Sequence, residues 1–305
     1  MNNKVVIVVG AVDKYSAAWP IFAHGFKKYW PDCPWEIVAI TNEKDFPIGR
    51  TIKIGKDRSW GETVRKGLEK INSDVILWVM EDYFVSGPVK GQIMENYAQL
   101  LLDNKVDHIR ILPPAVGLSE GGTQDPTIEC KCKYENIPNE ADKYLTRQLG
   151  FKENLIENLW IFKDDAEYRA SLATSLWRKD KFLEWIEDGM TPWQFEHDAG
   201  IKSRGNDRHL CCVRDDVLCW PWRTNPYPNG KCSPIRKGQW TGAAHEYVKY
   251  EKLDIDLQWH PNGARVASSV RIRDWFHFYI GKNSIIDDFC YISTRVEMGK
   301  HSHIA

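Results

Sequence analysis

The last part of the chain repeats with a period of six residues. Aliphatic side chains stand at Ile280, Ile286, Ile292, Met298 and Ile304. Smaller side chains stand two positions before the last four of them, at Ser284, Cys290, Val296 and Ser302. Each flat face of a left-handed parallel β-helix takes six residues and points one aliphatic side chain inward. The period therefore predicts the start of such a helix. Because its coils bury a core only by stacking on neighbours, we expect the natural protein to continue past Ala305.

Length and composition describe a folded, soluble type of chain. It has 305 residues, of which 43% are hydrophobic, and a net charge of -1. This charge balance, without a dense Lys/Arg cluster, argues against nucleic acid as a partner. The N-terminus has no cleavage site, and no apolar run is long enough to span a membrane. We therefore expect a cytoplasmic protein, with peripheral association with the inner membrane left open.

Cysteine and tryptophan usage add two expectations. The eight cysteines include no Cys-x-x-Cys pair, which favours reduced thiols over zinc ligands or disulfides. Fourteen tryptophans are a high number, and core packing is the default role for most of them. A flat indole also suits a sugar ring, and the four candidates for that role are Trp160, Trp177, Trp193 and Trp240.

The first 112 residues alternate strand and helix patterns. Apolar, β-branched runs predict strands at 4–9, 35–41, 51–54, 75–80 and 108–112. Helical patterns lie between them at 16–29, 59–71 and 89–102. Ser59, with Glu62 three residues later, is a typical helix start. The alternation predicts an α/β fold with a doubly wound parallel sheet.

The rest of the chain is less regular. Residues 113–150 are rich in Pro, Gly and Asn and predict a long insertion. Further strands are expected at 168–177, 210–213 and 217–222, helices at 179–187 and 192–201, a loop at 224–242, and a helix or linker at 243–257. We therefore divide the chain into a large domain at 1–245, a linker at 246–264 and the start of the β-helix domain at 265–305.

Two adjacent carboxylates follow the apolar strand at 75–80, at Glu81 and Asp82. In an open α/β sheet, ligands bind beyond the carboxyl ends of the strands. Carboxylates at that place can hold a divalent cation through hard oxygen ligands, and a nucleotide diphosphate is the natural partner of such a cation. The alternative is an acidic, solvated turn.

Three segments carry a resemblance to a family. VVGAVDKYS, SWGETVRKGLEK and ILWVMEDYFVSGPV resemble bacterial GT-A glycosyltransferases of capsule and lipopolysaccharide clusters, over residues 1–245. The resemblance implies that Glu81 and Asp82 bind Mn²⁺ or Mg²⁺ on a nucleotide sugar, although the family usually has Asp-x-Asp there. It also implies that the donor is contacted by Gly10, Ala11, Val12, Asp13, Tyr15, Ser59, Trp60 and Glu81.

A catalytic base is the next requirement. Inverting transfer needs a carboxylate near the acceptor hydroxyl, because attack proceeds with loss of a proton. The segment around TPWQFEHDAG resembles the acceptor region of the family, which implies catalytic roles for Glu196 and Asp198 and an acceptor contact for Trp193. The alternative is that Glu196 only interacts with the helix dipole.

Three cations late in the chain are candidates to hold the diphosphate: Lys231, Arg236 and Lys237. The alternative is that they are solvent-facing surface charges.

These observations favour a glycosyltransferase that moves a sugar, with inversion, from a nucleotide-diphosphate donor to a surface-polysaccharide acceptor. Whether this glycan acceptor is linked to a lipid is left open. Sugar-1-phosphate nucleotidyltransferases join similar domains, but their first loop reads GxGTRMxxxxPK where this chain has GAVDKYSAAWP. A non-catalytic glycan-binding scaffold is a further alternative. The repeat resembles hexapeptide acyltransferases. This resemblance implies a homotrimer and, as a second activity of the expected C-terminal continuation, acyl transfer with acetyl-CoA as cofactor. The alternative is that the coil has no activity and only oligomerises the enzyme.

Overall fold

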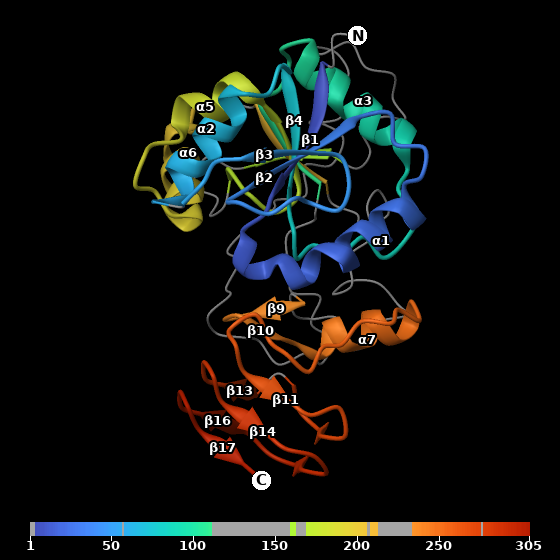
Figure 1. Cartoon of the computed structure of the whole chain (residues 1–305). Coiled ribbons are helices and arrows are strands. Elements are labelled where there is room, and N and C mark those ends of the chain that lie inside the picture. Colours follow the sequence, from blue (N-terminus) through green and yellow to red (C-terminus); the bar gives the residue numbers. More distant parts are fainter. Residues whose placement is uncertain are drawn as a thin grey trace. The chain divides into compact units, whose positions relative to one another are not determined.

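The structure is a computed structural model that describes residues 4–56, 58–111, 159–162, 169–205, 208–212, 234–275 and 277–305 (Figure 1). These residues form two compact units. The first holds residues 4–13 and 32–80 and the described residues from 89 to 212; the second holds 14–31, 81–88 and the described residues from 234 onward. The units interleave along the chain, and the linear boundaries at 245 and 264 stay a prediction.

A mixed eight-stranded sheet forms the centre of the first unit. In spatial order its strands are β3 (Arg50–Lys53), β2 (Glu36–Thr41), β1 (Val5–Gly10), β4 (Val75–Met80), β7 (Ser175–Arg178), β5 (His108–Arg110), β8 (His209–Cys212) and β6 (Leu159–Ile161). The half from β3 to β4 is parallel and has the doubly wound order 3-2-1-4. Strand β7 then pairs antiparallel with both β4 and β5. The α/β expectation is confirmed, and the sheet is mixed because of β7 and because β6 pairs antiparallel with β8.

The central strands are apolar along their whole length because both faces of the sheet are covered. In β1 and β4 all residues except the last are buried. Gly10 pairs with Met80, so both strands end at the same edge of the sheet. A Cβ on Gly10 would lie 2.6 Å from the ring of Trp78, so glycine is required where β1 ends.

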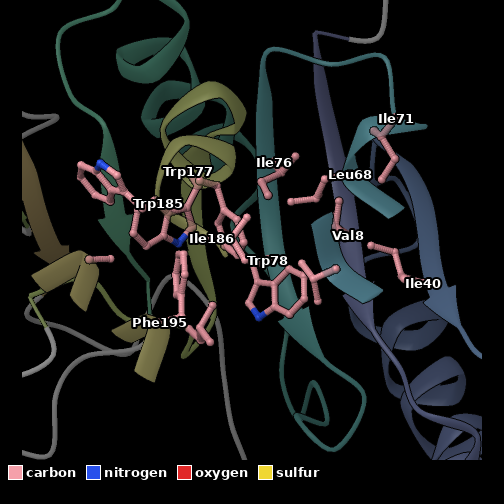
Figure 2. Packing of buried hydrophobic residues seen from close by; sticks show 14 of the residues in the cluster. Val8, Ile40, Leu68, Ile71, Ile76, Trp78, Trp177, Trp185, Ile186 and Phe195 are labelled. Atoms are coloured by element: carbon pink, nitrogen blue, oxygen red, sulfur yellow. The ribbon is translucent and has the colours of Figure 1, made fainter. Parts of the chain in front are cut away.

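The helices that the structure describes in the first unit are α2 (Trp60–Glu69), α3 (Gly91–Leu102), α5 (Lys179–Trp185) and α6 (Pro192–Lys202). Ser59 caps α2 as predicted, because its hydroxyl accepts the backbone N–H of Glu62 at 3.1 Å. A capping box between Thr191 and Gln194 starts α6. One core cluster joins α2, α5 and α6 to the sheet, and Figure 2 shows Trp78, Trp177 and Phe195 within it.

The second unit is built around α1 (Trp19–Tyr29), which follows a 3₁₀ helix at Asp13–Ala18, and α7 (Gly242–Tyr250). The Tyr247 hydroxyl donates to the carbonyl oxygen of Val85 at 2.7 Å. A Cβ on Gly25 would lie 2.4 Å from that hydroxyl, so α1 can approach only because residue 25 is glycine. This contact explains why segments distant in sequence form one unit.

Glu251 joins the same helices through charge. Its buried carboxylate accepts hydrogen bonds from Lys28 Nζ at 2.6 Å and Tyr29 Oη at 2.5 Å, and lies 2.9 Å from His24 Nε2. Burial by itself would raise the pKa of Glu251, but the hydrogen bonds from Lys28, Tyr29 and His24 outweigh it and hold the pKa below its ordinary value. The carboxylate therefore stabilises the contact between the two helices.

The C-terminal part of the second unit is a coil of short parallel strands. They are β11 (Arg265–Val266), β12 (Arg271–Ile272), β13 (Phe278–Ile280), β14 (Ile285–Ile286), β15 (Tyr291–Ile292), β16 (Val296–Met298) and β17 (His303–Ile304). They form three ladders, β11-β14-β17, β12-β15 and β13-β16. Paired residues stand twenty positions apart at first, as in Arg265 with Ile285, and eighteen later, as in Ile285 with His303.

The six-residue period corresponds to the interior of this coil. Ile280, Ile286, Ile292 and Met298 are buried in one cluster, and Ile304 packs against it. Ser284 is also fully buried, at one of the predicted small positions. The hand of the coil and its continuation past Ala305 remain predictions.

Some expectations fail or lie outside the described residues. Residues 169–174 are not a strand, because only Ser175–Arg178 pairs in the sheet. Strand β6 and the hairpin of β9 (Ile235–Arg236) and β10 (Gln239–Trp240) were not expected. The insertion at 113–150 and the strand at 217–222 lie outside the described residues. Among the described helices, none is both long and apolar enough to cross a membrane.

Candidate functional site

The loop after β1 is held by Asp13. Its carboxylate accepts the backbone N–H groups of Asn42 at 3.2 Å, Glu43 at 3.0 Å and Lys44 at 3.1 Å. In return, the side-chain oxygen of Asn42 accepts the N–H of Asp13 at 3.1 Å. The predicted nucleotide-contacting loop, Gly10 to Asp13, is thus fixed to the loop that follows β2. The local role of Asp13 is to organise these two loops, and donor binding by the four residues stays a prediction.

Ser59 and Trp60 have structural contacts in the first unit. The Ser59 hydroxyl accepts the N–H of Gly189 at 3.0 Å in addition to its capping bond. The Trp60 ring packs edge-on against Trp78 at 6.0 Å and lies 5.5 Å from Phe195, measured between ring centroids. These contacts account for both residue types without a ligand, so a role in donor binding remains a prediction for them as well.

In the second unit, Tyr15 lies close to the acidic pair. Burial raises the pKa of the Tyr15 phenol, and the negative charges of Glu81 and then Asp82 raise it further. Glu81 is buried, with 6% of its surface exposed, while Asp82 and Tyr15 are half-buried. Three residues that the resemblance assigned to donor or metal binding therefore share one partly desolvated, electronegative environment.

This environment fits a cation of the Mg²⁺ class. Mg²⁺ is commonly held by one or two carboxylates, with waters and substrate phosphates completing its coordination. Within the part of the chain that the structure describes, no three His, Cys, Asp or Glu residues gather as a complete metal site. Two carboxylates such as Glu81 and Asp82 are ligands of the type that this coordination uses.

Glu196 is anchored on the first unit. The backbone N–H of Leu172 donates to its carboxylate at 2.6 Å, and the Ser171 hydroxyl donates at 3.1 Å. Burial raises the pKa of Glu196, while the Leu172 N–H, the charge of Arg110 and the Ser171 hydroxyl act in the opposite direction without cancelling it. A carboxylate with a raised pKa and a fixed position can serve as a general base.

The neighbours of Glu196 on α6 differ in exposure. Trp193 is 71% exposed and stands one turn before Glu196, so the two share a face of the helix. Asp198 lies 2.9 Å from Nδ1 of His197. By contrast, Trp177 and Trp240 are fully buried, which rules out sugar stacking on either ring. The side chain of Trp160 is outside the described residues. Of the other three candidate sugar platforms, Trp193 is therefore the one whose ring is exposed.

Of the three late cations, Arg236 and Lys237 are described and Lys231 is not. Lys237 and Gly238 form the two-residue turn of the β9–β10 hairpin, with φ of 50° and 78°. Positive φ at both positions is typical of a type I′ turn. The Lys237 ammonium lies 5.4 Å from the centre of the Tyr279 ring. The turn therefore presents Lys237 toward the coil of the same unit.

Two of the cavities among the described residues lie mostly outside the predicted site residues, which contribute only Lys237 to the second of them. One, of about 260 Å³, lies beside the start of α2 and is lined by Ile54, Lys56, Arg58, Glu62, Thr63 and Lys66. The other, of about 410 Å³, is lined by Lys14, Lys237, Pro261, Asn262, Tyr279, Lys282 and Lys300, and we call it the lysine cleft. A signal for it was present in the sequence, where IGKNS at 280–284 and MGKHS at 298–302 repeat.

The known proteins that match this chain are solved structures. No protein-family model and no curated protein sequence matches the chain. Solved structures do match, and some of them contain UDP, UDP-GlcNAc or UDP-glucose.

The particular structures are distant. S. aureus TarS 1-349 is 10% identical, with a TM-score of 0.41, and covers 70% of this chain and 61% of its own. The same protein with UDP-GlcNAc is 11% identical, with a TM-score of 0.40, covering 83% of this chain and 68% of its own. Glucosyl-3-phosphoglycerate synthase from Mycobacterium tuberculosis with Mn²⁺ and UDP-glucose is 9% identical, with a TM-score of 0.31, covering 59% and 57%. At these identities and TM-scores, none of the likenesses supports an assignment of activity.

Proposed function

We propose that the protein is a glycosyltransferase that uses a nucleotide-diphosphate sugar and a divalent cation. The observation that carries the proposal is the shared environment of Tyr15, Glu81 and Asp82, where two carboxylates after an apolar strand act on a desolvated phenol. Carboxylates at this place can hold a divalent cation through hard oxygen ligands, and a nucleotide diphosphate is the natural partner of such a cation.

The residues have distinct roles in this proposal. Glu81 and Asp82 would hold Mn²⁺ or Mg²⁺, which neutralises the diphosphate as it leaves. The phenol of Tyr15 is protonated at neutral pH, as an ordinary phenol is, and can donate a hydrogen bond; its raised pKa acts in the same direction. Glu196 would take the proton of the acceptor hydroxyl, since the Leu172 N–H and the Ser171 hydroxyl hold its carboxylate in one orientation. Trp193 would provide an apolar surface for a sugar ring.

The finer features belong to the same proposal. A surface glycan as acceptor and inversion at the anomeric carbon follow from the resemblance and from the requirement for a base such as Glu196. Arg236, Lys237 and Lys231 remain candidates for contacts with the diphosphate, and Asp198 a second candidate acid beside Glu196. Acyl transfer with acetyl-CoA, membrane association and trimer formation are predictions that nothing in the described coil favours over a purely structural role.

A donor-binding experiment tests the proposal before an acceptor is known. Purified protein is titrated with UDP-, GDP- and CMP-sugars, with Mn²⁺ and without it, and slow donor hydrolysis is followed as release of nucleotide. We expect one donor class to bind, with at least a tenfold gain in affinity from Mn²⁺. The Glu81→Gln/Asp82→Asn variant should lose that gain, because it keeps the side-chain volumes but removes the charges.

Glu196→Gln provides the matched control. An amide oxygen can still accept from the Leu172 N–H, so the fold and donor affinity should be unchanged, whereas nucleotide release should fall by roughly a hundredfold or more, in the range for loss of a general base. If no donor binds, or if Mn²⁺ acts equally on the Glu81→Gln/Asp82→Asn variant, the proposal is wrong. Donor binding without any turnover, unaffected by Glu196→Gln, would instead support a glycan-binding scaffold.

A further inference from the structure

The lysine cleft brings together four ammonium groups from three separate parts of the second unit. Lys14 comes from the 3₁₀ helix before α1, Lys237 from the β9–β10 turn, and Lys282 and Lys300 from the coil. A hydrogen bond from the N–H of Asn262 to the carbonyl oxygen of Gly238, at 2.7 Å, ties the turn to the coil. The cleft is therefore a consequence of how this unit folds and not of a basic run in the sequence.

Lys282 and Lys300 occupy the same position on successive turns of the coil. The pairing of Ile285 with His303 sets residues eighteen positions apart side by side, so Lys300 stacks on Lys282. The N–H of His301 donates to the carbonyl oxygen of Lys282 at 3.0 Å, which joins the two turns at this corner. Neighbouring parallel strands lie about 4.8 Å apart, so the two lysine stems leave the coil at about that spacing.

The corner itself is built for close stacking. The residue that follows each of the two lysines has a positive φ, at Asn283 (56°) and His301 (55°). Gly263, at the same position of the preceding turn, has a φ of 83°. A Cβ on Gly281 would lie 2.3 Å from the carbonyl oxygen of Gly299, so no larger residue fits before Lys282. The Ser284 hydroxyl donates to the same oxygen at 2.7 Å. The backbone at this corner is thus fixed, and it fixes where the two lysines begin.

Among the described residues, no acidic side chain lines the cleft to balance its positive charge. Within the described part of the chain, none of the four lysines forms an ion pair with a carboxylate, and the residues lining the cleft include no acid. Some other charges of the coil do pair, as Arg265 and His303 do with Asp287. Stacked like charges repel unless an anion lies between them. The lysine cleft therefore has the charge pattern of an anion site.

We propose that the lysine cleft binds a diphosphate group carried by a second ligand, separate from any anion held through Glu81 and Asp82. Two phosphates about 3 Å apart in a diphosphate can each face one of the stacked lysines, at about their 4.8 Å spacing. Lys14 and Lys237 also line the cavity and add to its charge, so this proposal assigns Lys237 to the second ligand and not to the donor diphosphate. A volume of about 410 Å³ also admits part of the group that carries the diphosphate, and Tyr279 provides an aromatic surface for it.

Inorganic pyrophosphate is the probe, used with the full chain in a buffer without divalent cations and followed by calorimetry. Lys282→Ala/Lys300→Ala removes the two stacked lysines of the coil. Lys14→Ala/Lys237→Ala removes the two lysines of the cleft that come from outside the coil. Lys27→Ala/Lys249→Ala is the matched control, because it removes the same charge from two exposed lysines of the same unit. We expect each cleft variant to weaken pyrophosphate binding at least tenfold and the control to change it less than twofold. Circular dichroism and the melting temperature verify that each variant is folded.

The outcomes separate this proposal from the glycosyltransferase proposal. The Glu81→Gln/Asp82→Asn variant should bind pyrophosphate as wild type does, so failure of donor binding and failure of the lysine cleft are distinguishable. Equal losses in the control and cleft variants, binding that needs Mn²⁺ and Glu81, or no binding at all would overturn the proposal. Displacement by UDP would assign the diphosphate to a nucleotide, whereas displacement by geranyl diphosphate but not UDP would assign it to a lipid-linked ligand; either result supports the site.

Discussion

Replacing Glu251 by glutamine should destabilise the second unit by about 3 kcal/mol. The Glu251 side chain is fully buried, while Lys28 and His24 keep 47% and 33% of their side-chain surface exposed. A hydrogen bond to a charged group contributes roughly 1.5–3 kcal/mol. The hydrogen bond from Tyr29 is expected to contribute about 1.5 kcal/mol. The bonds from Lys28 and His24 together are expected to add about the same amount, because both side chains are partly exposed and solvent screens their interaction with Glu251.

Urea denaturation followed by far-ultraviolet circular dichroism measures this change. The conservative variant keeps volume and one acceptor oxygen, so the loss reports the charge and not a cavity. Lys249→Ala on α7 is the control, because Lys249 is exposed and its replacement should cost less than about 0.5 kcal/mol. A Lys28→Met variant should lose less stability in the Glu251→Gln background than in wild type.

The loss of unfolding free energy in Glu251→Gln should depend on pH. The folded-state pKa of Glu251 lies below its unfolded value, so its stabilisation is complete above the unfolded pKa of about 4.3 and is lost as pH falls through the folded pKa. The difference in unfolding free energy between wild type and Glu251→Gln should therefore be constant above about pH 5 and shrink below it. A cost under about 0.5 kcal/mol at pH 7, or a difference that grows on acidification, would refute this account of Glu251.

Two further predictions concern the coil and the buried histidines. Gly281→Ala should cost about 3 kcal/mol or more, since the new Cβ would lie 2.3 Å from the backbone oxygen of Gly299; an unchanged melting temperature would show that the turns are not stacked as described. Burial lowers the pKa of His245 to about 4 and of His260 to about 3. Both groups must gain a proton on unfolding in acid, so their stabilisation is complete above about pH 6.5 and declines as pH falls toward those values. His245→Phe should reduce the slope of melting temperature against pH between 6.5 and 4, and an unchanged slope would contradict the role of burial.

Much of the fold was predictable because its signals are local. The strand Val75–Met80 was predicted from six apolar residues in a row, and the start of α2 from a serine whose hydroxyl reaches the third residue after it. The burial of Ile280, Ile286, Ile292 and Met298 follows from a six-residue period. By contrast, the insertion of antiparallel β7 between β4 and β5 depends on pairing between distant segments, which a single sequence does not encode in any short pattern.

The candidate site was predictable in part for the same reason. The acidic pair could be found because it directly follows a buried strand. Its closeness to Tyr15, sixty-six positions earlier in the chain, follows from no local pattern and was suggested only by the resemblance, which assigned Tyr15 and Glu81 to one donor. Asp13 was expected to contact a nucleotide, whereas its carboxylate accepts backbone N–H groups from the loop after β2. An aspartate after a strand fits either role in sequence, and only the partner loop distinguishes them.

The lysine cleft shows what a sequence period contains beyond its buried positions. Because six residues form one face and three faces close a turn, residues eighteen apart must stack wherever the period holds, outside as well as inside. The rule that buries Ile280 and Met298 together also sets Lys282 over Lys300 on the surface. Reading only the aliphatic positions predicts the core of the coil. Applying the same period to the charged positions predicts a column of like charge, and a column of like charge without acidic partners is favourable chiefly when an anion occupies it.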